Sequence, residues 1–224
     1  MKNLQSFFEL DNIPTGLYLY KMKATVNRSP ENTRQKILKA AFDEFYRNGF
    51  QGGSVNHIVD RAGTTKGALF HHFNGKDDLG YAVVEEVIQP QMQKRWFNLL
   101  ADSVDPITDL KRAFREYRKD ELSSGMLLHG CPLNNLAQEM SPLDEGFRKR
   151  IDKVYASWRE CLSNAFARGI KAGTVRKGVS PHKVAAFVVA AQTGMIGTAK
   201  NAQSDELLTQ AAQVLFDYLD SLKP

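Results

Sequence analysis

Apolar residues recur at helical spacing along most of this chain, and no segment alternates between apolar and polar residues as a half-buried strand does. The clearest apolar stripe has four members at i, i+3, i+4 and i+7, namely Val55, Ile58, Val59 and Ala62. A second, shorter stripe follows at Leu69 and Phe73, spaced by four. These spacings predict two short amphipathic helices in an all-α protein.

The turn between these two helices has its own signals. Gly63 follows the first stripe, and glycine accepts the left-handed backbone that ends a helix. Thr64 or Thr65 can then cap the second helix through a side-chain oxygen. Two short helices around a glycine turn have the size of a helix-turn-helix that reads DNA. The outward side chains suit phosphates and base edges, and they are Thr65, Lys66, Gly67, His71 and His72.

The rest of the chain is also predicted to be helical, with about nine helices in all. A three-helix head is expected to join a larger helical domain through a long helix, which Pro90 is expected to kink. We expect an N-terminal extension or arm at 1–27, a helix-turn-helix DNA-binding domain at 28–78, and a ligand-binding and dimerisation domain at 79–224. The remaining helices are expected at 32–48, 77–100, 106–121, 144–171, 181–200 and 204–222, with short turns at 133–140 and a loop at 123–132.

The last two predicted helices offer more apolar surface than one subunit covers easily. Ala186, Ala190 and Gly194 lie at i, i+4 and i+8, so a partner helix can approach closely. This favours a homodimeric four-helix interface, and a well-packed monomer core is the alternative.

Composition narrows the class of protein. The 224 residues are 42% hydrophobic with a formal charge of +5, which supports a packed core and permits nucleic-acid binding. Two cysteines, Cys131 and Cys161, make neither a disulfide framework nor a tetrahedral metal site, and we expect no metal and no cofactor. Neither a signal peptide nor a membrane span is evident, which predicts a cytoplasmic protein with no membrane partner. Residues 1–21 are either a genuine arm or the product of a start codon assigned too far upstream.

The run AGTTKGALFHHFNGKDDL, residues 62–79, resembles the signature of the TetR/AcrR family of bacterial transcriptional regulators. The resemblance covers the head, at residues 32–79, and implies three helices docked on double-stranded operator DNA. It implies that Thr65, Lys66, Gly67 and Ala68 enter the major groove at the start of the recognition helix. It also implies phosphate contacts by four residues, Arg34, Ser54, His71 and Lys76.

One head residue differs from the residue usual in the family, and two others have an alternative interpretation. Phe70 stands where the family usually has tyrosine, which removes a hydroxyl expected to contact phosphate. Ser54 can instead serve only as a helix cap. His72 can instead be a hydrogen-bonded histidine of the interior.

The family resemblance also implies how the protein works. We expect a homodimeric repressor that a small-molecule effector releases from a palindromic operator by shifting the kinked helix. Aromatic residues and one cysteine in the larger domain are the candidates for the effector pocket, although aromatics at helical spacing are more often plain core. The candidates are Trp96, Phe114, Tyr117, Cys131, Tyr155 and Trp158.

Cys131 leaves further interpretations open. Its segment, HGCPLNNLAQE, resembles one in some family members, where a Gly-Cys pair opens a helix above the pocket. A helix N-terminus favours the thiolate, as a protonated His129 would, so Cys131 is a candidate sensor of electrophiles or oxidants. A packed thiol is the alternative.

A cysteine-dependent enzyme is a further class. The sequence supplies no third orienting group and no oxyanion-hole motif for it, so we expect no enzymatic activity. A helical interaction protein with a degenerate head is the remaining class, which the intact Lys66 and Gly67 disfavour.

Overall fold

All the regular secondary structure is helical in the computed structural model, which describes residues 30–124 and 126–224, without the side chains of 119–127. No strand occurs in those two ranges, so the prediction of an all-α fold is confirmed. The predicted arm at 1–27 and both interpretations of residues 1–21 lie outside the described residues.

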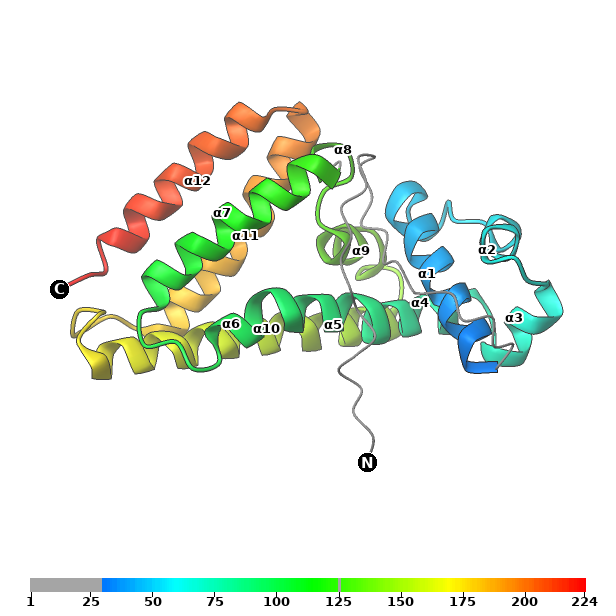
Figure 1. Cartoon of the computed structure of the whole chain (residues 1–224), viewed down its shortest axis with the longest axis horizontal. Coiled ribbons are helices and arrows are strands. Elements are labelled where there is room, and N and C mark those ends of the chain that lie inside the picture. Colours follow the sequence, from blue (N-terminus) through cyan, green and yellow to red (C-terminus); the bar gives the residue numbers. More distant parts are fainter. Residues whose placement is uncertain (1–29, 125) are drawn as a thin grey trace.

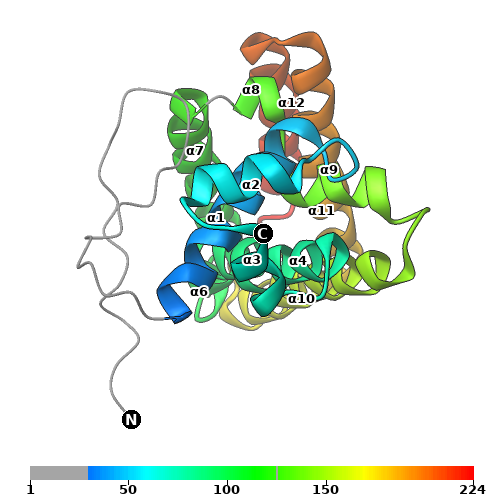
Figure 2. The same ribbon diagram turned by 90° about the vertical axis from the view of Figure 1, so that its right-hand side faces the viewer.

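Three helices form a head at one end of the molecule (Figures 1 and 2). They are α1 (Pro30–Asn48), α2 (Val55–Ala62) and α3 (Lys66–His72). Helix α1 starts two residues before the predicted start, at Pro30, because proline at a first helical position lacks only an N–H that would be unpaired. Gly49 ends it with a left-handed φ of 74°. Five buried apolar residues fill the space between the three helices, Ile37, Leu38, Ile58, Leu69 and Phe73.

A long helical run leads from the head into the body. Its segments are α4 (Lys76–Ala82), η2 (Val83–Ile88), α5 (Gln89–Met92), η3 (Gln93–Phe97) and α6 (Asn98–Leu100). Both η segments are π-helical, since Gln89 N–H donates to Val84 O and Asn98 N–H donates to Gln93 O. They flank Pro90, which has no N–H for the α-helical ladder, and wider π-helical turns accommodate such a break. The single helix predicted at 77–100 is therefore present, with a widened rather than regular backbone around the proline.

The body contains six further helices in the described ranges. They are α7 (Pro106–Ser124), α8 (Met126–His129), α9 (Pro132–Met140), α10 (Glu145–Ala172), α11 (Pro181–Ala202) and α12 (Asp205–Asp220). The prediction of a loop at 123–132 was wrong, because the helical break falls later, at Gly130, which has a φ of 76°. Asp144 caps α10 by accepting the N–H of Phe147 at 2.7 Å, and Gly173 ends it with a φ of 77°.

The helices of the body form two groups (Figure 1). Helix α10 lies along the long run and packs against α4, η2, η3 and α6. Helices α11 and α12 pack against each other, α11 also packs on α10, and α7 packs on α12. The run thus packs against α10 along much of its length and begins directly after the head. A displacement in the body therefore has a continuous helical route to the head.

Candidate functional site

The turn between α2 and α3 has the geometry that its residues predict. Gly63 adopts a left-handed conformation with a φ of 61°, and an added Cβ there would meet nothing within 4 Å. Thr65, rather than Thr64, caps α3, since its Oγ1 accepts the N–H of Ala68 at 3.2 Å. The first helical residue of α3 is consequently Lys66.

The start of α3 presents the predicted DNA-reading residues to the outside. Thr65, Lys66, Gly67 and His71 are exposed, and Ala68 is half-buried. Leu69 is fully buried beneath them, which fixes the orientation of the helix. A Cβ added at Gly67 would meet only Thr65 Oγ1, at 3.8 Å, so the interior of the head does not require glycine there. The open space beside Gly67 leaves room for a partner to approach the backbone closely.

A buried carboxylate on α1, that of Glu44, holds the start of α2. Glu44 Oε1 accepts the N–H of Ser54 at 3.0 Å and lies 3.3 Å from His57 Nδ1. Burial acts to raise the pKa of this carboxyl group, but hydrogen bonds from Ser54, Asn48 and His57 outweigh it and lower the pKa overall. Glu44 was not predicted from the sequence as a functional residue. Its signal was a charged residue on the apolar stripe of α1, four residues before the end of that helix.

Ser54 serves as a cap, as its alternative interpretation predicted. Its Oγ accepts the N–H of His57 at 3.5 Å, at the N-terminus of α2. Arg34 donates to both carboxylate oxygens of Glu86 in η2 through its two terminal nitrogens, Nη1 and Nη2, with an Nη2···Oε1 distance of 2.6 Å. Its guanidinium lies 4.9 Å from the centre of the Phe73 ring. The hydrogen bond with Glu86 raises the pKa of Arg34. This ion pair ties the start of α1 to the long run.

Lys76 also has partners within the protein. Its Nζ donates to Gln51 O at 3.0 Å and lies 4.9 Å from the centre of the Phe50 ring. It therefore connects the start of α4 to the loop that precedes α2. Predicted phosphate contacts by Arg34, Ser54 and Lys76 would have to coexist with these internal bonds.

Phe70 and His72 differ in their exposure and contacts. Phe70 is 52% exposed on α3, so the aromatic ring is presented to a partner or to water rather than to the core. His72 is half-buried, with its ring 5.3 Å from that of His71, and it makes no hydrogen bond with the described residues. The interpretation of His72 as a hydrogen-bonded interior histidine is not supported.

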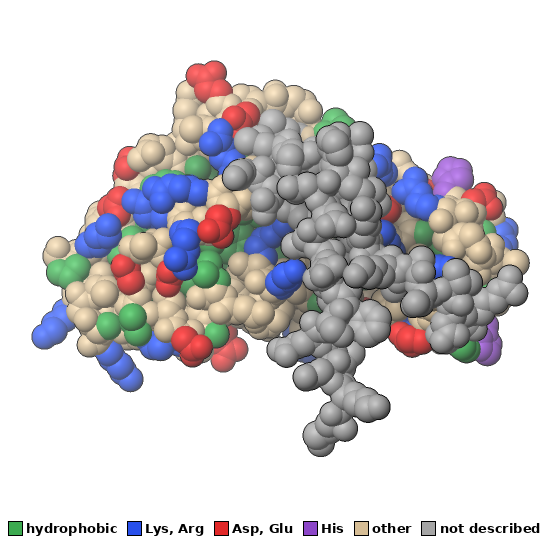
Figure 3. All heavy atoms as spheres, in the orientation of Figure 1, with side chains coloured by type: hydrophobic (Ala, Val, Ile, Leu, Met, Phe, Trp, Pro, Cys, Tyr) green, Lys and Arg blue, Asp and Glu red, His purple; other side chains and the backbone are tan. Residues whose placement is uncertain are grey.

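Charged side chains are mixed over the body. On the face seen in Figure 3, lysines and arginines alternate with aspartates and glutamates, and histidines stand out on the head. This part of the body therefore carries no extended field of one sign.

Four of the six predicted pocket residues pack against one another. The Trp96 ring lies 5.2 Å from that of Phe114, 5.7 Å from that of Tyr117 and 5.7 Å from that of Trp158, between ring centres. All four are at most 9% exposed. They form the aromatic core that joins η3 to α7 and α10, so plain core is the better description of Trp96 and Trp158.

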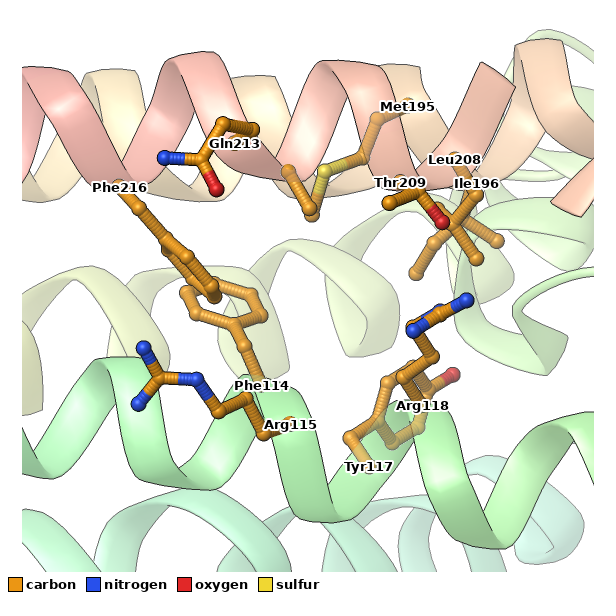
Figure 4. A pocket seen from close by; sticks show the side chains of 11 residues that line it. Phe114, Arg115, Tyr117, Arg118, Met195, Ile196, Leu208, Thr209, Gln213 and Phe216 are labelled. Atoms are coloured by element: carbon orange, nitrogen blue, oxygen red, sulfur yellow. The ribbon is translucent and has the colours of Figure 1, made fainter. Parts of the chain in front are cut away.

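A pocket of about 290 Å³ opens beside this core, between α7, α11 and α12 (Figure 4). Phe114 and Tyr117 line it, whereas the other four predicted residues, Trp96, Cys131, Tyr155 and Trp158, do not. Most of the lining was not predicted from the sequence, including Arg115, Arg118, Met195, Leu208, Gln213 and Phe216. These residues come from three helices, so no local pattern could have grouped them.

Two buried polar atoms of the body make no hydrogen bond with the residues that the structure describes. They are Trp158 Nε1 and Gln192 Oε1, on side chains that are 2% and 3% exposed. Gln192 lies four residues before the pocket residue Ile196, on the same face of α11. A buried polar atom without a partner is unfavourable by about 1–3 kcal/mol, so replacing either side chain by an apolar one tests the packing of the body.

Cys131 lies at the N-terminus of α9, as its segment predicted, with Pro132 in the first turn. The thiol is half-buried, close enough to Tyr155 to affect it. Burial raises the pKa of Tyr155, and a negative charge on Cys131 raises it further. Burial, Arg47 and Lys200 together lower the pKa of His129, so a protonated His129 is disfavoured as the group that would stabilise a thiolate.

Helix α9 also binds the head. The Glu139 carboxylate accepts the N–H of Phe50 at 2.8 Å and that of Gln51 at 2.7 Å. Tyr46 Oη donates to Gly130 O at 2.6 Å. These bonds join the end of α1 and the following loop to both ends of α9, which makes α9 a second connection between body and head.

Two other classes of site, metal centres and membrane-spanning helices, are absent from the described ranges. Nowhere in 30–124 or 126–224 do three His, Cys, Asp or Glu side chains gather as metal ligands do. In the same ranges, no helix combines the length and the apolar character that crossing a membrane requires.

Comparisons with known proteins agree with this architecture. Residues 37–83 match the family described as bacterial regulatory proteins, tetR family, and residues 107–215 match the tetracyclin repressor-like C-terminal domain. The HTH-type transcriptional regulator LmrA of Bacillus subtilis is 30% identical over 131 residues, which are 57% of this chain and 67% of that relative. The HTH-type transcriptional repressor DhaR of Mycobacterium sp. is 27% identical over 187 residues, 83% of this chain and 91% of that relative.

Solved structures show the same fold. A tetR-family transcriptional regulator from Cytophaga hutchinsonii has a TM-score of 0.78 at 20% identity, covering 87% of this chain and 96% of that one. A TetR transcriptional regulator from Chloroflexus aurantiacus has a TM-score of 0.75 at 24% identity, covering 87% and 97%. With its head and its body both matched, this chain belongs to the tetR family of bacterial regulatory proteins and is a helix-turn-helix transcriptional regulator.

Proposed function

We propose that this protein is a homodimeric repressor that leaves a palindromic operator when a small molecule binds its body. The observation that carries the proposal is the outward presentation of Thr65, Lys66, Gly67 and His71 at the start of α3. A recognition helix enters the major groove with its N-terminal residues, and this is where the short and basic residues lie. The protein would act on chromosomal DNA in the cytoplasm.

Within the head, we propose a division of roles. Lys66 and His71 are exposed and would contact the DNA, with Gly67 and Ala68 allowing the backbone to approach a base edge. Arg34, Ser54 and Lys76 already bind within the protein, so we assign them a smaller share of the phosphate contacts.

The proposed dimer uses the outer face of α11 and α12. Phe187, Leu207 and Val214 are exposed there, at 47%, 37% and 68%. A Cβ added at Gly194 would meet nothing within 4 Å, which leaves room for a helix from a second copy. An exposed apolar face of this kind is typical of an interface, and two-fold symmetry pairs it with itself.

For effector release, we propose a route through the aromatic core. Phe114 and Tyr117 line the pocket and also contact Trp96, which lies on the long run that reaches the head. An effector that prefers the arrangement of heads unable to bind DNA would shift the population toward that arrangement.

A gel-shift assay on the DNA upstream of the protein's own coding region tests the repressor proposal. We expect salt-sensitive, sequence-dependent binding, because phosphate contacts release counterions. Lys66→Ala is expected to weaken binding about tenfold to a hundredfold, since one base contact contributes about 1–3 kcal/mol. Lys171→Ala, at the far end of α10, is the matched control and is expected to have no effect.

Val214→Glu tests the dimer by light scattering and by the same gel shift. A charge at this exposed apolar position is expected to yield monomers in light scattering and to abolish operator binding, because two linked heads bind two half-sites. A Val214→Glu protein that stays dimeric would place the interface elsewhere.

A second candidate function is an electrophile- or oxidant-sensing repressor that acts through Cys131. The position of its half-buried thiol at the start of α9, the helix that binds the head through Glu139, favours this alternative. Cys131→Ser decides it. Release of DNA by electrophiles in the wild type but not in the variant would support the sensor, and equal release in both would exclude it.

A further inference from the structure

The pocket between α7, α11 and α12 has an apolar floor and a basic edge (Figure 4). Phe114 and Tyr117 rise from α7, and Met195 and Leu208 face them from the opposite helices. A volume of about 290 Å³ lies at the lower end of the range for ligand sites, roughly 300–1,000 Å³. The occupant is therefore small and largely apolar.

The basic edge consists of two arginines on α7, and they are bonded differently. Arg118 binds both carboxylate oxygens of Asp205, at 3.1 and 2.7 Å, so its charge is already compensated. Arg115 has no carboxylate partner among the side chains that the structure describes. Its guanidinium lies 5.2 Å from the centre of the Phe216 ring, which holds it beside the pocket. Arg115, an exposed residue, thus stands at the edge of an apolar cavity with no described carboxylate bound to it.

A carboxylate is the anion that fits one such arginine best. The planar guanidinium can donate two parallel N–H bonds to a carboxylate, and one such pair leaves no excess charge in the site. A phosphate monoester carries up to two charges and would leave about one of them facing an apolar floor, which is unfavourable.

We infer that this pocket binds a small carboxylic acid with an apolar or aromatic body. Its carboxylate binds the guanidinium of Arg115, and its body packs against Phe114, Tyr117 and Leu208. The inference rests on the proposed function, because it assigns a chemical class to the effector.

The position of the pocket suits an effector. Tyr117 contacts the long run twice, through the Trp96 ring and through Arg95, whose guanidinium lies 4.4 Å from the centre of the Tyr117 ring. On the other side, Leu208 and Phe216 belong to α12, which also carries the exposed Val214 of the proposed dimer face. An acid between α7 and α12 therefore contacts both the helix that leads to the head and the helix that would meet a second copy.

Matched acids and amides test the inference on the full-length protein. The probes are benzoate, 4-phenylbutyrate and octanoate, each paired with its neutral amide. We expect at least one acid to raise the melting temperature and bind in calorimetry, with its amide at least tenfold weaker. Arg115→Gln is expected to weaken that acid at least tenfold. Arg112→Gln, one turn away on α7 and exposed, is the control and is expected to change binding less than twofold.

Ala212→Phe provides a second variant because it places a large side chain in the pocket and leaves both arginines in the sequence. It is expected to abolish acid binding while the protein without ligand keeps a single thermal transition. The inference is overturned if no acid binds, if the amides bind as tightly as the acids, if Arg115→Gln binds like the wild type, or if Ala212→Phe still binds the acid.

These outcomes remain distinct from a failure of the proposed function. Operator binding by the unliganded wild type is measured separately in the gel shift. Salt-sensitive operator binding together with no preference for acids would overturn only the ligand class. Absence of operator binding would overturn the repressor itself, whichever compounds bind the body.

Discussion

The head and the body of this protein build their sites in different ways. The head places its outward groups on consecutive residues of one short helix, α3, capped by Thr65 and anchored by Leu69. The body collects its pocket from α7, α11 and α12, which lie far apart in the sequence. One site is a local feature of the chain, and the other exists only after three helices have packed.

The two regions also differ in how completely their buried polar groups are satisfied. In the head, the buried Glu44 has hydrogen-bond partners at the start of α2, and its pKa is lowered as a result. In the body, the buried Trp158 Nε1 and Gln192 Oε1 have no hydrogen-bond partner among the described residues. A satisfied network holds one arrangement firmly, whereas unsatisfied groups leave other arrangements closer in energy. This contrast suits a rigid reader of DNA joined to a receptor that changes shape.

The largest expected effect is a loss of stability in the head. Glu44→Ala removes the acceptor of the Ser54 N–H and leaves a cavity, so we expect the free energy of unfolding to fall by about 3 kcal/mol. Urea denaturation measures this change. Glu31→Ala, on the exposed first turn of the same helix, is the control and is expected to change it by less than about 0.5 kcal/mol. Equal stability of the two variants would mean that Glu44 does not hold α2.

The next effect separates reading from folding in the head. Gly67→Ala is expected to weaken operator binding at least tenfold, about 1.4 kcal/mol, because a methyl group would intrude where the backbone approaches the DNA. The same change is expected to leave the melting temperature equal or higher, since alanine favours a helix by up to about 1 kcal/mol and has room here. Unchanged operator binding would remove Gly67 from the interface.

The difference between head and body explains how far the sequence could be interpreted. Gly63, Thr65 and the stripe that includes Ile58 predict their own local geometry, because caps, left-handed glycines and i, i+4 contacts are set by near neighbours. Two consecutive helices packed on a third are enough to place α3, so its exposed residues could be named in advance.

The pocket could not be named in this way. The sequence predicted all the aromatic candidates equally as pocket residues. Among them, Phe114 and Tyr117 line the cavity, whereas Trp96 and Trp158 lie in the packed core. Which side of an aromatic cluster remains open depends on how α12 docks, and that docking is a long-range property. Arg34 shows the same limit in the head, since its partner, Glu86, lies in a different helix 52 residues away.

A smaller effect tests the unsatisfied interior of the body. Gln192→Met replaces a buried amide with an apolar side chain of similar volume and removes the unpaired Oε1. We expect the free energy of unfolding to rise by about 1 kcal/mol, measured by urea denaturation. The variant is also expected to respond less to effector, because one group that favours rearrangement is gone. A loss of stability above about 1 kcal/mol would show that Gln192 is satisfied in solution, and the contrast with the head would weaken.

The smallest expected effect concerns pH at the junction of head and body. Burial, with the positive charges of Arg47 and Lys200, lowers the pKa of His129 below its ordinary value of 6.5. The unfolded chain therefore binds a proton at a higher pH than the folded protein does. The stability that neutral His129 provides is complete above about pH 6.5. It declines as the pH falls through that value toward the lower pKa of the folded protein. Thermal denaturation at about pH 7.5 and about pH 5.5 is expected to show a larger decline for the wild type than for His129→Gln, which cannot be protonated in this range. The same decline in both proteins would mean that His129 is as easily protonated in the folded protein as in the unfolded chain, and that this junction is open to water.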